Sequence, residues 1–196
     1  MRLNLLKTTG LLLLSGLLMP AGVLLARNTS QAPAVTASTA NWYDVEQASN
    51  LFNHMNTLAQ NVRRQVAPLQ VQGYQLDWTA QAARLTLARN DINNMGRDLM
   101  RLNGMKTRLE PWQQSLVHKI APDQHEMVYQ ANAAIQNLNN HEDRTYLAMT
   151  QYPQNINQIY KNAVQMANTI ETVIHSAQAE HKMAALNRMT RTNAGS

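Results

Sequence analysis

The chain of 196 residues has no cysteine, only seven glycines and a single phenylalanine. Without cysteine, the chain cannot form disulfide bonds, thiolate metal sites, c-type haem attachments or lipid-modified cysteine anchors. So few glycines leave little room for loops that hold nucleotide phosphates, and no Walker loop is present. These absences argue against a disulfide-stabilised scaffold and against the common nucleotide-dependent enzymes.

Signatures of other enzymes are missing as well. The sequence contains neither a Gly-x-Ser-x-Gly elbow nor a His-Glu-x-x-His motif. Charged residues make up 15% of the chain, and its twelve acidic residues form no convincing catalytic pair. We therefore predict a protein that is not an enzyme.

The one long apolar run lies near the N-terminus. Arg2 and Lys7 precede the run at 11–26, and small residues at 32–34 match the spacing that a signal peptidase reads. The run is about 16 residues long, short of the roughly 20 that a membrane-spanning helix needs. We predict a signal peptide over residues 1–34, and an uncleaved membrane anchor is the alternative.

Removing this leader changes the charge balance of the chain. Arg2, Lys7 and Arg27 are lost without any acidic residue, so 17 basic residues become 14 against 12 acidic ones, and the net charge falls from +5 to +2. A charge of +2 gives no indication of a nucleic-acid partner. We expect an exported protein, periplasmic or secreted, that contacts a membrane only through an uncleaved leader.

The remainder of the chain has the pattern of four amphipathic helices. Apolar residues recur at alternating spacings of three and four, and no period-two strand pattern competes. The predicted helices cover residues 43–67, 76–103, 107–138 and 154–187. Their apolar seams include Val45, Ala48, Phe52, Met55, Ala59, Val62 and Val66; Leu85, Ala88, Ile92, Met95, Leu99 and Leu102; Leu109, Trp112, Leu116, Ile120, Met127, Ala131, Ala134 and Leu138; and Ile156, Ile159, Ala163, Met166, Ile170, Val173 and Ala177.

Local signals place the helix ends. Pro68 is predicted to end the first helix, and Gly104 to cap the C-terminus of the second. Thr107 and Glu110 have the spacing of a capping box at the start of the third helix. Pro122 is predicted to break or kink that helix.

These elements predict an all-α fold, an antiparallel up-down four-helix bundle with a Pro-kinked third helix. The bundle is assigned to residues 42–189, after a linker at 35–41 and before a frayed tail at 190–196. A further short helix could cover 142–149, separated from the last long helix by Pro153.

Three tryptophans fall near predicted helix starts. We expect Trp42, Trp78 and Trp112 to close the ends of the bundle as core residues.

Six histidines make a metal site worth testing by helical projection, at about 100° per residue. No interior set of three ligands emerges, so we predict no metal or other cofactor. Glu171 and His175, one turn apart, could chelate an ion at the surface, but an exposed hydrogen bond between them is the favoured interpretation. The other histidines are predicted as solvated at His54, His118 and His125, and on the seam side but near opposite bundle ends at His141 and His181.

Methionine recurs two residues after histidine, at His125 with Met127 and at His181 with Met183. Thioether and imidazole groups suit copper, particularly Cu(I). Residues two apart on a helix point about 200° apart, however, and Met127 belongs to a seam. Core packing is the favoured interpretation, and a haem- or copper-carrying bundle remains the alternative.

Arginines gather on the face of the second helix that lies opposite its seam. Arg97 and Arg101 share this face, with Arg108 near and with Asp91 and Asp98 beside them. A solvated charged face is the first interpretation. The alternative is a docking site for acidic lipid or polysaccharide.

Two segments resemble stretches of uncharacterised exported helical proteins of bacteria. They are NNMGRDLMRLN at 93–103 and EPWQQSLVHKIAP at 110–122. The resemblance implies a bacterial envelope protein, and it carries no activity and no site residues with it.

Asn and Gln number 39, more than the 29 charged residues, so the expected surface is mostly amide. Together these features predict an exported, non-catalytic bundle of the bacterial envelope that binds or scaffolds through its surface. Its partner is expected to be another protein or a second copy, since the long seams could equally pair between chains.

Overall fold

A computed structural model of the protein describes residues 42–72, 75–141 and 147–193. Within these residues the regular structure is entirely helical, as predicted. The leader at 1–34 and the linker at 35–41 lie outside the described residues. The elements are α1 (Trp42–Gln72), α2 (Trp78–Gly104), the short 3-10 helix η1 (Lys106–Arg108), α3 (Pro111–Asn140) and α5 (Tyr152–Asn193).

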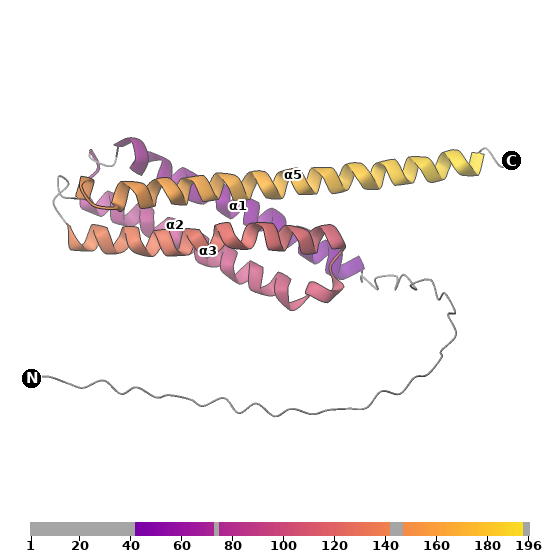
Figure 1. Ribbon diagram of the computed structural model, residues 1–196, viewed down its shortest axis with the longest axis horizontal. Helices are drawn as coiled ribbons and strands as arrows, with labels where there is room; N and C mark the ends of the chain where they lie inside the picture. The colour runs from indigo at the N-terminus through magenta and orange to yellow at the C-terminus, as the bar shows by residue number, and fades with distance from the viewer. Residues whose placement is uncertain (1–41, 73–74, 142–146, 194–196) are drawn as a thin grey trace, which may run out of the picture. The chain divides into compact units, whose positions relative to one another are not determined.

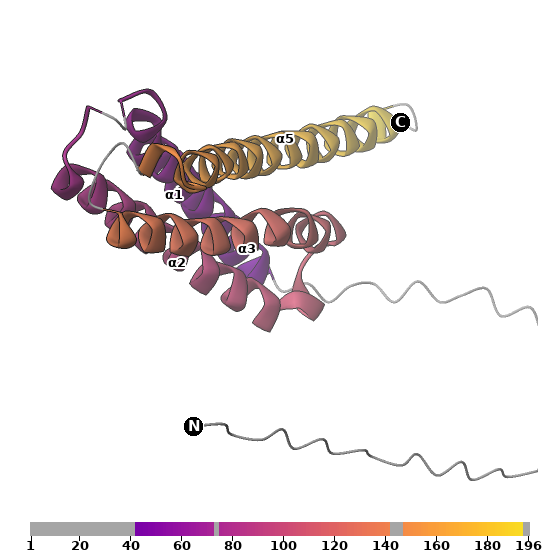
Figure 2. The same ribbon diagram turned by 60° about the vertical axis from the view of Figure 1, so that its left-hand side comes forward.

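The four long helices pack in a closed order. Helix α1 packs against α2, α2 against α3, α3 against α5, and α5 returns to α1. Figures 1 and 2 show this arrangement from two directions. Consecutive helices are therefore neighbours, which confirms the predicted up-down four-helix bundle.

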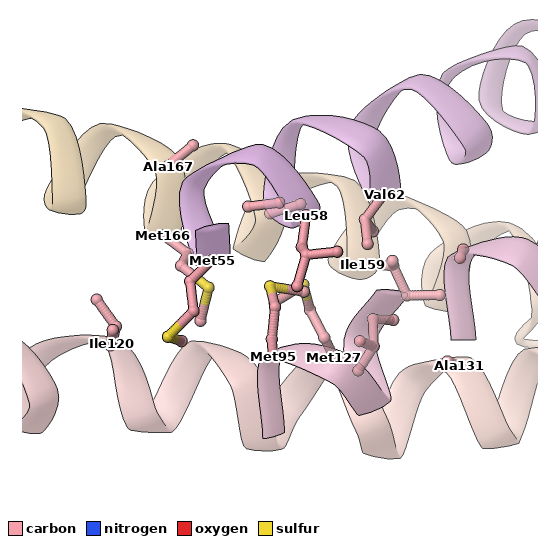
Figure 3. Packing of buried hydrophobic residues seen from close by; sticks show 14 of the residues in the cluster. Met55, Leu58, Val62, Met95, Ile120, Met127, Ala131, Ile159, Met166 and Ala167 are labelled. Carbon is pink, nitrogen blue, oxygen red and sulfur yellow. The ribbon is translucent and has the colours of Figure 1, made fainter. Parts of the chain in front are cut away.

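The core is built mostly from the predicted seams, with one stripe from each helix facing inwards, although Val45, Trp112 and Val173 of those seams are only half-buried. Met55, Met95, Met127 and Met166, one from each long helix, are all fully buried. Figure 3 shows these four side chains in one region of the core. Between the larger side chains, buried alanines let the helix backbones approach, as at Ala48, Ala59, Ala88, Ala131, Ala134 and Ala163.

Helix α1 does not end at Pro68, as the sequence predicts, but continues to Gln72. Proline removes one backbone hydrogen bond from a helix interior. Val66 and Leu69, on either side of Pro68, are both buried in the core. Their burial favours the helical path at this point, so tertiary packing outweighs the local preference of proline.

Helix α2 begins at Trp78, two residues later than predicted, because Asp77 forms its N-cap. The Asp77 side chain accepts a hydrogen bond of 2.7 Å from the backbone N–H of Ala80. Gly104 is the last residue of α2, and Met105 is the cap residue. The predicted cap at Gly104 is therefore wrong, and none of the described glycines adopts a positive φ.

The predicted capping box of the third helix is displaced by one turn. Thr107 lies in η1, and the capping box pairs Glu110 with Gln113. The Gln113 side chain accepts a hydrogen bond of 3.1 Å from the backbone N–H of Glu110. Pro111, which favours the first position of a helix, fixes this start. Pro122 lies inside α3, which continues to Asn140 without a break.

Helix α5 begins at Tyr152, with Pro153 in its first turn, where the missing N–H has no intrahelical acceptor. It continues to Asn193, into the segment that the sequence assigns to a frayed tail. Of the short helix considered at 142–149, residues 142–146 lie outside the described ranges.

The three tryptophans lie in first turns, as predicted, but they are not all core residues. Trp42 is 76% exposed and Trp78 is 39% exposed. The Trp78 indole N–H donates to the backbone carbonyl of Leu138 at 3.0 Å and thereby joins the start of α2 to the end of α3. Trp112 is half-buried, with its ring centroid 6.3 Å from that of Phe52.

Candidate functional site

A polar cluster joins α1 to α2 on the side of the bundle where the sequence predicts a solvated face. His54 Nδ1 lies 2.7 Å from Asp98 Oδ2, and Arg101 Nη1 lies 3.4 Å from Asp98 Oδ1. The Asp98 side chain is 3% exposed, whereas those of His54 and Arg101 are mostly exposed. The prediction of a solvated Asp98 is therefore wrong, because His54 and Arg101 cover it.

The predicted arginine face does not form as a group. Arg101 pairs with Asp98, whereas Arg108 pairs with the buried Asp44 of α1 at 3.5 Å. Burial raises the pKa of the Asp91 carboxyl, and the nearby His54 opposes part of that rise. Two of the three arginines thus hold carboxylates of the chain itself.

A cavity of about 350 Å³ opens where the start of α1, the start of α3 and the later part of α5 meet. Apolar and polar side chains both line it. The apolar residues are Val45, Trp112, Ile174 and Ala177, and the polar residues are Ser49, Asn53, Glu110, Gln178, His181 and Lys182.

Hydrogen bonds fix the walls of this cavity. The Glu110 carboxylate accepts from the indole N–H of Trp112 and lies 3.8 Å from His181 Nε2. The fully buried Gln113 donates to the backbone carbonyl of Val45 at 3.0 Å and to Ser49 Oγ at 3.4 Å. The α3 side of the cavity is thereby tied to α1 and, through His181, to α5.

A second cavity of about 420 Å³ continues along α1 and α5. It shares Asn53, Ile174 and Gln178 with the first, so the two form one depression, which we name the α1–α5 groove. The remaining residues of the second cavity are Asn56, Gln60, Glu171 and His175.

Glu171 and His175, the surface metal candidates, lie in this groove. Their side chains are 56% and 72% exposed, and Oε1 and Nε2 are 3.8 Å apart. This is an ion-pair distance rather than a hydrogen bond. Among the residues described, no group of three histidine, aspartate or glutamate side chains is placed to hold a metal ion.

For the remaining histidines, some predicted exposures are confirmed and others are wrong. His118 and His125 are exposed, as predicted. His141 is the C-cap of α3 and is half-buried. His181 is mostly exposed rather than on a packed seam, although it lies beside Glu110, the N-cap residue of α3.

The fold separates one methionine–histidine pair and leaves both residues of the other exposed. Met127 is buried while His125 is exposed, and Met183 is exposed beside the equally exposed His181. The sequence correctly assigns Met127 to the core. Its convergence with three other methionines depends on the register between helices, which no single seam reveals.

The last part of α5 is little covered by the other helices. We name residues 178–191 the α5 extension; all of them are exposed except the half-buried Ala185. Met183, Leu186 and Met189 are 59%, 56% and 65% exposed. Figure 1 shows α5 continuing past the other helices. The helix predicted at 154–187 includes most of this extension, but its apolar seam ends at Ala177, and Met183, Leu186 and Met189 lie off that seam by helical projection.

No family model, no curated protein and no solved structure matches this chain. None of the described helices has the length and hydropathy needed to cross a membrane.

Proposed function

We propose that the protein is an exported, non-catalytic binding module of the bacterial cell envelope and that it binds through the α1–α5 groove. The observation that carries this proposal is the groove itself. It joins two cavities of about 350 and 420 Å³, each within the usual range for ligand sites. Export rests on the leader pattern at residues 1–34.

The α5 extension supports a binding role at the same end of the molecule. His181 and Lys182 belong both to the extension and to the groove. The exposed apolar side chains Met183, Leu186 and Met189 follow directly. The seam residues are buried inside the single chain, so a protein partner or a second copy would bind exposed residues such as these rather than the seams.

The experiment that tests this proposal is site-specific photo-crosslinking in the native envelope. A photoreactive residue at Gln178, in the groove, is compared with one at Leu87, which is 51% exposed on α2 and away from the groove. We expect an adduct from Gln178 and none from Leu87. Adducts of equal yield at both positions, or none at either, would contradict the proposal.

Processing is tested on the same exported protein. Its intact mass should lack residues 1–34, and a full-length mass in the membrane fraction would favour the uncleaved anchor.

One observation favours copper carriage as a second candidate function. Met55, Met95, Met127 and Met166 bring four thioethers from four helices into one region of the core. Thioether ligands select Cu(I). Titration with Cu(I) against a chromogenic chelator tests this function, with Met95→Leu as the variant and Met183→Leu as its exposed control. Stoichiometric uptake that Met95→Leu alone abolishes would support copper, and a Soret band in the purified protein would indicate haem instead.

A further inference from the structure

We infer that the α1–α5 groove binds an uncharged oligosaccharide chain. This inference rests on the proposed binding function and names the ligand class that the groove would take. Three features carry it: side-chain amides that make no hydrogen bond to described residues, a low net charge, and a tryptophan among the lining residues.

The amides of the groove are not engaged by the fold. The side chains of Asn53, Gln60 and Gln178 make no hydrogen bond to any described residue, although all three line the groove. By contrast, the Gln113 and Gln124 side chains, which lie between helices, donate to backbone carbonyls. Carboxamides both donate and accept hydrogen bonds, as sugar hydroxyls do, so the groove offers matching partners along its length.

A fourth amide adds an independent observation. Asn56 lines the second cavity, and its Oδ1 atom is buried without a hydrogen-bond partner among the described residues. A buried acceptor without a donor is costly. A ligand hydroxyl reaching Asn56 after a small rotation of the amide would remove that cost.

The charge of the groove favours a neutral ligand. Each carboxylate at the groove has a histidine beside it, Glu110 with His181 and Glu171 with His175, both at 3.8 Å. Lys182 is the remaining charged residue among those that line the groove. A polyanion would meet both carboxylates, and a polycation would meet Lys182.

One tryptophan lines the groove, and a second is exposed in the first turn of α1. Trp112 is the one that lines the first cavity. Trp42 is 76% exposed, and helical projection places it within about 20° of Asn53 on the same face of α1. Indole faces pack against apolar surfaces, and the C–H faces of sugar rings provide such surfaces. The arrangement therefore suits a linear chain that stacks at one end and forms hydrogen bonds along the rest.

The test is a binding titration of the exported protein, without its leader, against three neutral probes: maltohexaose, cellohexaose and chitohexaose. Tryptophan fluorescence and calorimetry measure the binding. We expect at least one probe to bind with a millimolar or tighter Kd and to change the fluorescence. Absence of binding by all three probes at millimolar concentration overturns the inference.

Matched variants show whether the groove amides are responsible. Asn53→Ala combined with Gln178→Ala should weaken binding by about tenfold or more. Gln47→Ala removes an exposed amide from α1 at about 120° from Asn53 and should leave the Kd unchanged. Circular dichroism confirms that each variant folds. Equal losses in both variants, or no loss in either, overturn the inference.

Failure of this inference is distinguishable from failure of the proposed function. If photo-crosslinking from Gln178 captures a partner while no hexasaccharide binds, the groove is a binding site for another class of ligand. In that case the oligosaccharide assignment alone is wrong.

Discussion

The two halves of α5 carry similar residues in very different surroundings. In the first half, Ile159, Met166 and Ile170 are fully buried against the other helices. In the α5 extension, Met183 and Leu186 are more than half exposed. Apolar residues occur in both halves, but those of the extension project about 120–180° from Ala177, the last residue of the seam.

A helix with an apolar face does not always have another helix packed against that face. Alternation of three and four residues indicates a helix with an apolar face, and it says nothing of whether another helix is present to cover that face. The first residues of the extension do have neighbours, since Gln178, His181 and Lys182 line a cavity with Val45 and Trp112. From Met183 to Arg191 the residues are exposed except the half-buried Ala185, so the first half stabilises the fold while the end of the second remains accessible.

The same substitution should have very different effects in the two halves of α5. Met166→Ala should lower the free energy of unfolding by about 2–5 kcal/mol, because it leaves a cavity in a packed core. Met183→Ala should change it by less than about 0.5 kcal/mol, since Met183 is 59% exposed. Urea unfolding of both variants measures the difference. Similar losses would mean that the extension is packed in solution.

Two histidine–carboxylate pairs extend the comparison from apolar to polar contacts. His54 lies 2.7 Å from the buried Asp98, whereas His175 lies 3.8 Å from the exposed Glu171. We expect His54→Ala to cost about 1 kcal/mol, since it removes a hydrogen bond to a carboxylate that is itself shielded from water.

The matched variant His175→Ala should be neutral within the error of urea unfolding, because exposed ion pairs contribute little. A larger loss for His175→Ala than for His54→Ala would show that the α1–α5 groove stabilises the fold more than the α1–α2 contact does.

The bundle itself could be predicted from the sequence, because each seam is long enough to outweigh local signals. The ends of the helices were predicted less accurately than the helices themselves. Pro68 is a strong local signal, but burial of Val66 and Leu69 around it outweighs the lost hydrogen bond. Thr107 and Glu110 have the right spacing for a cap, but Pro111 fixes the helix start one turn later.

The α1–α5 groove could not be predicted from the sequence, for a different reason. Glu171 and His175 could be paired because they lie on one helix, one turn apart. Asn53 and Gln178 come together only through the packing of α1 against α5, and amides carry no periodic signal that would reveal it. Helical projection also placed His54 in solvent correctly, but it could not show that Asp98 lies beneath it.

The buried Asp123 makes the stability of the protein dependent on pH. Burial raises the pKa of the Asp123 carboxyl, whose Oδ2 has no hydrogen-bond partner among the described residues. The folded chain therefore holds this proton more tightly than the unfolded chain, whose pKa is about 3.9. Stability attributable to Asp123 falls as pH rises from that value through the folded-state pKa.

Asp123→Asn should consequently stabilise the protein at neutral pH, and the gain should disappear at a pH below both pKa values. Urea unfolding at a series of pH values measures it. Glu171→Gln, in the exposed groove, is the control and should show no such dependence. A gain that is constant with pH would rule out the desolvated carboxylate as its cause.

Gly96 lies where α2 approaches Gln124 of α3, and replacing it should change the stability only slightly. A Cβ atom at Gly96 would lie 2.8 Å from Nε2 of Gln124, which donates to the Ile92 carbonyl at 3.4 Å. That contact is the end of a flexible side chain, so Gln124 can move at the cost of one long hydrogen bond. Glycine costs a helix interior about 0.5–1 kcal/mol relative to alanine, so Gly96→Ala should stabilise the protein by up to about 0.5 kcal/mol. Thermal unfolding measures the change, and a clear loss of stability would show that the two helices need the glycine at this contact.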